Sequence, residues 1–178
     1  MDPVIDTTLR TALSLLFVVA AAHKVRDLGR FRATLAEYRL LPDALARHGA
    51  ALAVAVEAAV AAALVAPALR TPGLVSAATL LLVYAAAIGI NLARGRRDLD
   101  CGCAGPAVRR PISGWLVARN VALAAVAIAA VVPVRPRALV WVDVATIAGG
   151  TAVLAALDAS VDRMLADWPG LARLRVRA

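Results

Sequence analysis

Five long apolar stretches divide this chain and constrain its fold more than any other feature. They cover residues 8–23, 49–69, 73–93, 114–134 and 138–157. A helix needs about 20 mostly apolar residues to cross the hydrocarbon core of a bilayer. The chain is 62% hydrophobic and 18% charged, whereas a soluble domain averages about 45–50% apolar and 25% charged residues. We therefore expect an all-α polytopic membrane protein, built as a four-helix bundle core with a fifth transmembrane helix.

The segment between the first two stretches has a different pattern. Over residues 27–41, apolar side chains recur at helical spacing opposite charged ones, and the apolar set is Leu28, Phe31, Leu35 and Tyr38. This pattern is typical of an amphipathic helix that lies on the membrane surface. A solvated connector is the alternative interpretation.

The formal net charge of +8 would by itself also fit a nucleic-acid-binding protein. The basic residues instead flank the apolar stretches, which indicates lipid as the partner and argues against nucleic acid. With five spans, fifteen basic residues fall on one side of the membrane and four on the other, with Arg119 inside a span. Because cytoplasmic loops are enriched in Arg and Lys, we expect a bacterial plasma-membrane protein with its N-terminus outside and residues 94–113 in the cytoplasm.

Both cysteines, Cys101 and Cys103, lie in that loop and are separated by one glycine. A disulfide between them would close a very small, strained ring that is easily reduced, which favours thiol–disulfide exchange over a structural bridge. Metal binding and the absence of any chemical role are the alternatives. Zinc normally takes four ligands, and only His23 and His48 could add to the two sulfurs, so no metal site is expected.

Other polar residues are expected around the same loop. Lys24, Asn91, Arg119 and Asn120 lie near span ends on the cysteine side, and the last two could orient a thiolate or a quinone carbonyl. A snorkelling side chain is the alternative for Arg119. Glu57 lies near the middle of the second stretch, where an ionised group is costly unless it is paired or faces a cavity. It is either a proton carrier or head-group contact, or a neutral, hydrogen-bonded carboxyl that locks helix packing.

The cysteine loop also carries a resemblance to a known family. Residues 91–105, with the sequence NLARGRRDLDCGCAG, are followed by ISGW at 112–115 and RN at 119–120. Together with residues 23–42, they resemble the MauE family of methylamine-utilisation proteins, which is grouped with DoxX-like redox-associated membrane proteins. The resemblance covers about residues 7–135. We therefore expect a MauE/DoxX-like transmembrane bundle there, and a fifth span with a basic tail over residues 136–178.

The resemblance implies a helical bundle distantly like that of vitamin K epoxide reductase. It also implies a role in maturing methylamine dehydrogenase, whose disulfide-rich small subunit acts outside the cytoplasm. Our hypothesis is a membrane-embedded thiol–disulfide redox protein in which Cys101 and Cys103 exchange electrons with a partner protein or a membrane quinone. Enzyme activity, as a thiol–disulfide oxidoreductase or an electron relay, depends on this pair. The alternatives are a non-catalytic membrane chaperone or scaffold and, third, a small transporter, for which inverted repeats are lacking.

Overall fold

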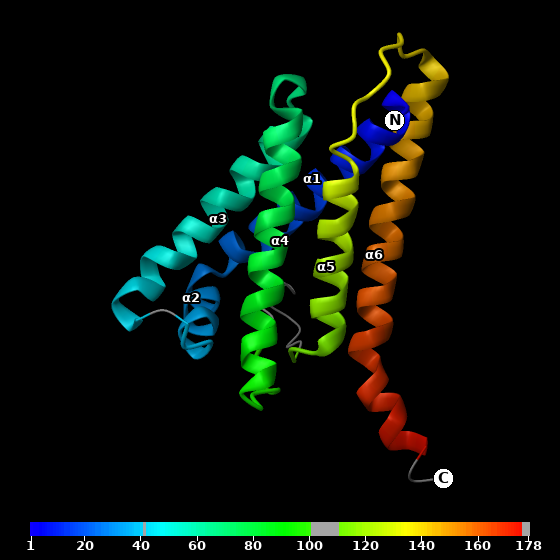
Figure 1. Cartoon of the computed structure of the whole chain (residues 1–178). Helices are drawn as coiled ribbons and strands as arrows, with labels where there is room; N and C mark the ends of the chain where they lie inside the picture. Colours follow the sequence, from blue (N-terminus) through cyan, green and yellow to red (C-terminus); the bar gives the residue numbers. More distant parts are fainter. Residues whose placement is uncertain (41, 101–110, 176–178) are drawn as a thin grey trace.

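The computed structural model describes residues 1–40, 42–100 and 111–175. This part of the chain is helical, with a single isolated β-bridge and no strand. Its helices are α1 (Pro3–Arg26), α2 (Leu28–Glu37), α3 (Asp43–Val65), η1 (Pro67–Leu69), α4 (Arg70–Ala93), α5 (Gly114–Ala129) and α6 (Trp141–Arg175). In Figure 1, α1 begins at the upper end of the bundle, and α4 finishes at the lower end. The predicted all-α class is confirmed.

Four helices have the length and apolar composition needed to cross a membrane. They are Pro3–Arg26, His48–Val65, Pro67–Ala93 and Trp141–Val161. The shorter helix α5 is apolar but has 16 residues, or about 24 Å at 1.5 Å per residue, against a hydrocarbon core of about 30 Å. It packs along α4 and carries the chain back to the upper end (Figure 1). The chain is therefore a multi-pass membrane protein.

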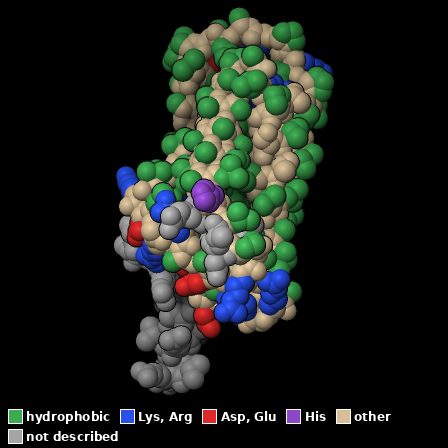
Figure 2. Space-filling model, turned by 90° about the vertical axis from the view of Figure 1, so that its left-hand side faces the viewer, with side chains coloured by type: hydrophobic (Ala, Val, Ile, Leu, Met, Phe, Trp, Pro, Cys, Tyr) green, Lys and Arg blue, Asp and Glu red, His purple; other side chains and the backbone are tan. Residues whose placement is uncertain are grey.

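The outer surface fits a lipid environment. Large apolar side chains such as Leu52, Val83 and Ile128 are exposed, and none of the α6 span is buried. Figure 2 shows hydrophobic side chains over the middle of the face that it presents, with Lys, Arg, Asp and Glu gathered mainly toward its lower end. This is the distribution expected when the solvent around the middle of the protein is hydrocarbon rather than water.

Small residues let the helices approach closely. A Cβ placed on Gly73 of α4 would lie 3.0 Å from the backbone carbonyl of Ala63 in α3, so the close approach of these two helices requires glycine there. Ala77 and Ala127 are fully buried where α4 meets its neighbours, around the larger side chain of Phe17 from α1. Close approach through small side chains is the usual way in which membrane helices pack.

The predicted amphipathic segment forms α2, which packs against α3 at the lower end. Asp27 caps it by accepting a hydrogen bond from the backbone N–H of Arg30. The helix ends before the predicted boundary because Arg39 has a φ of 48°, a left-handed conformation that cannot continue a helix. Its apolar side chains Phe31 and Leu35 face a cavity in the bundle.

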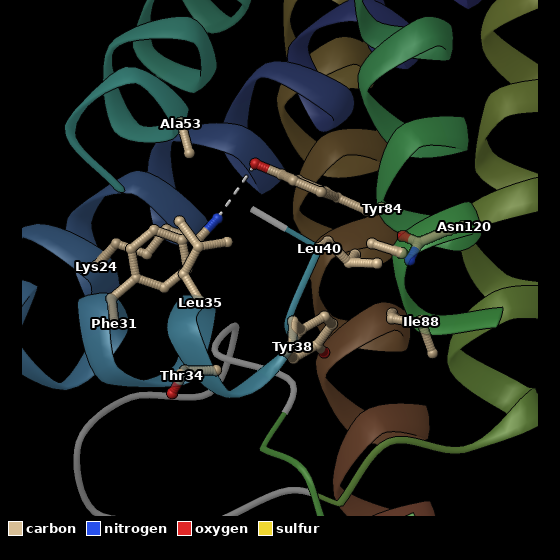
Figure 3. A pocket seen from close by; sticks show the side chains of 11 residues that line it. Lys24, Phe31, Thr34, Leu35, Tyr38, Leu40, Ala53, Tyr84, Ile88 and Asn120 are labelled. Atoms are coloured by element: carbon tan, nitrogen blue, oxygen red, sulfur yellow. Dashed lines mark hydrogen bonds between the residues drawn. The ribbon is translucent and has the colours of Figure 1, made fainter. Parts of the chain in front are cut away.

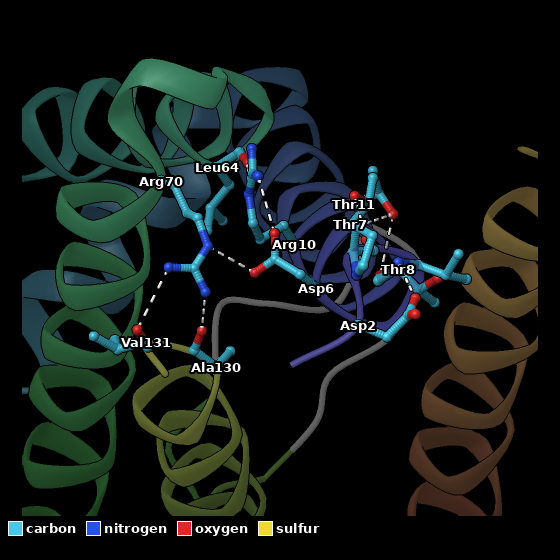
Figure 4. Close-up of polar contacts among 12 residues, drawn as sticks. Asp2, Asp6, Thr7, Thr8, Arg10, Thr11, Leu64, Arg70, Ala130 and Val131 are labelled. Atoms are coloured by element: carbon cyan, nitrogen blue, oxygen red, sulfur yellow. Dashed lines mark hydrogen bonds and ion pairs between the residues drawn. The ribbon is translucent and has the colours of Figure 1, made fainter. Parts of the chain in front are cut away.

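A buried ion network holds the upper end together (Figure 4). The Asp6 carboxylate of α1 accepts from Arg10 at 3.3 Å and from Arg70 of α4 at 2.9 Å. Arg10 Nε also donates to the carbonyl of Leu64, where α3 ends, at 2.7 Å. Arg70 donates to the carbonyl of Ala130, beyond α5, at 2.6 Å. Carbonyls at helix ends lack helical partners, so the two arginines tie three helices to α1.

The last helix, α6, lies at the edge of the bundle and packs along α1. The hydroxyls of Thr11 and Thr151 are 2.7 Å apart, which joins these two helices by a hydrogen bond. A bidentate ion pair between Arg119 of α5 and Asp158 of α6 makes a second attachment. The helix is therefore fixed by a few polar contacts rather than by an apolar core.

Candidate functional site

The site is built around two ionisable residues, one at the end of the first apolar stretch and one inside the second. Lys24, near the end of α1, forms an ion pair with Glu57 of α3 through Nζ and Oε1. The two side chains are 2% and 0% exposed. The hydroxyl of Tyr84 in α4 donates to the same Oε1 at 2.7 Å. Because charges are costly in an apolar bundle, each of these residues depends on the other for a counter-charge.

Aromatic rings surround the lysine. Its Nζ lies 5.1 Å from the ring centroid of Phe31 and 4.9 Å from that of Tyr84. A cation at this distance from a ring face is stabilised by the negative potential of the ring. The two ring contacts therefore add to the ion pair at a buried position of Lys24.

This cluster has unused hydrogen-bonding capacity. Within the described residues, Glu57 Oε2 is buried and has no hydrogen-bond partner. Lys24 donates to Glu57 and, at 3.4 Å, to the hydroxyl of Tyr84, whereas an ammonium has three N–H donors. Native proteins rarely leave buried polar atoms unpaired, and such atoms mark places where water, a ligand or a proton can bind.

A cavity of about 100 Å³ opens beside the cluster. Figure 3 shows Lys24 and Tyr84 on one side of it and Asn120 of α5 on another, with apolar side chains between them. The apolar and aromatic part of the lining includes Phe31, Leu35, Tyr38, Leu40 and Ile88. Mostly apolar walls with a few polar groups are typical of ligand sites.

The two predicted asparagines have different surroundings. Asn120 is 8% exposed and lines the cavity. Asn91 is fully buried near the end of α4, where its amide donates to the carbonyl of Ala87 and its Oδ1 accepts from Arg96, both at 3.1 Å. Asn91 is therefore bonded within its own helix and to Arg96, and it is not a lining residue of the cavity.

Arg119 is oriented toward α6 rather than into the cavity. Its Nε and Nη2 donate to the two oxygens of Asp158, at 2.8 and 2.5 Å, and it is not among the lining residues. Neighbouring helical residues point about 100° apart. Asn120 and Arg119 consequently face different partners, although the sequence places them side by side.

Cys101 and Cys103 lie outside the described residues, but both ends of their segment are described. Asp100 and Pro111 form an antiparallel β-bridge, and the N–H of Ile112 donates to the carbonyl of Leu99 at 2.9 Å. Arg30 of α2 binds Asp100 with an N–O distance of 2.7 Å. These contacts hold the two ends next to each other and against α2.

The same ends pack beside the cavity. Leu99 and Ile112 are buried in a small apolar cluster with Leu116, Tyr38 and Ile88. Tyr38 and Ile88 of this cluster also line the cavity. One layer of side chains therefore separates the base of the cysteine segment from the cavity that holds Lys24 and Tyr84.

Sequence reasoning missed three contributors to this site. Tyr84 and Arg30 were not singled out, and Phe31 was noted only as part of an amphipathic pattern. One signal was available, because Tyr84 lies seven residues before Asn91 and so on the same face of a helix. Of the expected residues, Lys24, Glu57 and Asn120 are gathered at or beside the cavity, whereas Asn91 and Arg119 are bonded elsewhere.

Comparison with known proteins supports a family assignment. Residues 2–133 match the family model described as methylamine utilisation protein MauE. The chain is 42% identical over 164 residues to the methylamine utilization protein MauE of Paracoccus denitrificans, covering 90% of this chain and 88% of that protein. The MauE protein of Paracoccus versutus is 38% identical over 163 residues, with the same coverage of both chains.

A more distant relative extends the comparison. The MauE protein of Methylorubrum extorquens is 37% identical over 139 residues, which are 77% of this chain and 75% of that protein. No solved structure gives a significant match. The family model and these relatives agree over most of the chain, and we conclude that it belongs to the MauE family of methylamine utilisation proteins.

Proposed function

We propose that this protein is a membrane-embedded thiol–disulfide redox protein that uses Cys101 and Cys103. Its client is a protein that needs disulfides, such as the small subunit of methylamine dehydrogenase. One observation carries the proposal: the β-bridge between Asp100 and Pro111 fastens both ends of the cysteine segment beside a cavity that is bordered by Lys24 of the buried Lys24–Glu57 pair. Reactive cysteines work in places where local charge controls proton transfer.

The chemistry is a two-step exchange. A client thiolate attacks one sulfur of the Cys101–Cys103 disulfide, forming a mixed disulfide and releasing the other cysteine as a thiolate. A second client thiolate then attacks the mixed disulfide, which leaves the client with a disulfide and this chain with a dithiol. Two electrons have moved from client to chain, so a two-electron oxidant must restore the pair before the next cycle.

The test is the variant Cys101→Ser/Cys103→Ser, which removes every thiol because the chain has two cysteines. We expect the client to accumulate with reduced cysteines while the variant reaches its normal level in the membrane. The number of client disulfides is counted by mass spectrometry after alkylation, with Ser76→Ala on the exposed face of α4 as the control. Normal client oxidation would instead support a scaffold that binds the client without reacting.

The sidedness of the pair can be tested separately. The excess of arginine in residues 94–113 and around α2 predicts that this end of the bundle faces the cytoplasm. Reduced Cys101 and Cys103 should then resist a membrane-impermeant maleimide in intact spheroplasts and react after permeabilisation. Labelling from outside would reverse the orientation and place the pair on the same side as an exported client.

A further inference from the structure

We propose that the cavity beside Lys24 and Tyr84 binds the head group of a membrane quinone. The inference deepens the proposed function, and rests on it in one respect, because a quinone would be the oxidant that restores the cysteine pair. Its structural basis is independent of the cysteines and lies in the polar groups and shape of the cavity.

The polar groups of the cavity suit a ring that carries carbonyl oxygens. Lys24 of α1 and Asn120 of α5 line it and can donate hydrogen bonds, whereas the single O–H of Tyr84 is already donated to Glu57. Lys24 and Asn120 lie on different sides, with apolar side chains between them (Figure 3). A quinone head group has flat apolar faces and hydrogen-bond acceptors at opposite edges of the ring, which matches this alternation.

The unused capacity of the ion pair points to the same ligand. The ammonium of Lys24 has a third N–H without a partner among the described residues, and the lysine borders the cavity. A carbonyl oxygen would accept from that N–H. As the ring gains electrons, negative charge builds on this oxygen, and a nearby ammonium stabilises it.

Glu57 is placed to transfer protons to Lys24. Its Oε1 accepts from both Lys24 and Tyr84, while the buried Oε2 has no partner in the described chain. A proton that leaves Lys24 Nζ for the ring oxygen can be replaced by one of the two protons that the dithiol releases, which the unpaired Oε2 of Glu57 can accept and pass on. Glu57 is therefore a positioning and proton-relaying residue, and it is not itself a lining residue.

Electrons and protons balance when a quinone oxidises the cysteine pair. Oxidation of the dithiol to a disulfide releases two electrons and two protons, and reduction of a quinone to a quinol consumes two of each. The S–S bond forms as the two S–H bonds break, and two O–H bonds form on the ring. No further oxidant is needed for the chain to complete one turnover.

The experiment measures binding of decylubiquinone to the purified full-length protein in lipid nanodiscs. The variant Ala53→Phe fills the cavity from α3, and Ala55→Phe places the same ring on the exposed face of that helix. We expect Ala53→Phe to weaken binding at least tenfold and Ala55→Phe to change it less than twofold. Both variants are first checked for wild-type helical content and thermal stability.

If Ala53→Phe does not fold, Asn120→Leu serves as the second variant, because it removes one donor without adding bulk. It should weaken binding severalfold. Glu57→Gln should leave the affinity within about threefold but slow reduction of bound decylubiquinone by dithiothreitol. Wild-type affinity in both cavity variants would overturn the site, and so would equal competition by decanol, which would indicate a cavity for acyl chains.

The cysteine variant separates the two proposals. Cys101→Ser/Cys103→Ser should bind decylubiquinone with wild-type affinity while losing client oxidation. If the wild-type protein binds decylubiquinone but does not oxidise the client, the quinone site is supported and the proposed thiol function is refuted. If it oxidises the client but does not bind decylubiquinone, the thiol function is supported and the quinone site is refuted.

Discussion

The two ends of this bundle each bury a carboxylate against a basic residue, but they use it differently. At the upper end, both oxygens of Asp6 accept hydrogen bonds, and its partners Arg10 and Arg70 also bind carbonyls at helix ends. At the lower end, Glu57 receives two bonds on one oxygen and none from the described residues on the other.

The residues around the two buried clusters also differ. The upper network ties α1 to α3, α4 and the end of α5, whereas the lower pair borders a cavity. A saturated network stabilises one arrangement of helices, while an unsaturated pair keeps capacity for a ligand or a proton. We infer from the comparison that the upper cluster serves the fold and the lower cluster serves the function.

The largest effect is expected from Asp6→Ala. This change leaves the buried guanidinium groups of Arg10 and Arg70 without a counter-charge, which should lower the free energy of unfolding by about 3–5 kcal/mol. Unfolding in mixed micelles with increasing denaturing detergent measures the loss. Glu37→Ala, on the exposed side of α2, is the control and should change stability by less than about 0.5 kcal/mol. Similar losses of stability in both variants would show that Asp6 contributes no more to the fold than an exposed carboxylate does.

A second prediction concerns removal of the lower pair. Replacing Lys24 with Met or Glu57 with Leu alone leaves an unpaired buried charge and should cost about 3 kcal/mol. The double variant Lys24→Met/Glu57→Leu should recover to within about 1 kcal/mol of the wild type, because apolar side chains can replace a buried ion pair. Client oxidation should remain lost in the double variant. A double variant as unstable as the single ones would show that the pair is structural.

The attachment of α6 should contribute less. Arg119 and Asp158 are 17% and 33% exposed, so their ion pair is worth about 1 kcal/mol or less after solvent screening. A double-mutant cycle with Arg119→Ala and Asp158→Ala measures this coupling, and Arg163→Ala on the exposed surface of α6 is the control. If Arg119 only holds α6, both single variants should affect client oxidation equally. Much slower client oxidation in Arg119→Ala alone would indicate that Arg119 acts in the redox site.

The smallest effect is expected at the exposed N-terminus. A hydrogen bond from Arg137, and then one from the backbone N–H of Val4, lower the pKa of Asp2 below its ordinary value of 3.8. The resulting stabilisation is complete above that ordinary value and is lost as the pH falls through the lowered pKa. The stability difference between wild type and Asp2→Asn should therefore vanish at the acidic end of a pH series. A difference that grows on acidification would contradict this assignment.

Much of the fold could be predicted from the sequence because its causes are local. Apolar stretches of membrane-spanning length predicted the long helices, and the charge pattern over residues 27–41 predicted α2. Glu57 stood out for the same reason, since an ionisable residue in an apolar stretch needs a partner. The identity of that partner depends on how α1 and α3 cross, which no spacing within either helix reveals.

The sequence by itself determined that this chain enters a membrane as helices, because transfer of apolar side chains into lipid depends on each segment's own composition. It also predicted which polar residues would need an explanation. Only the tertiary structure decided how those residues pair. The rotation of α5 directs Asn120 to the cavity and Arg119 to Asp158, and the crossing of α1 with α3 and α4 brings Lys24, Glu57 and Tyr84 together. Such pairings depend on helix orientation, which is set by the packing of all neighbouring helices at once.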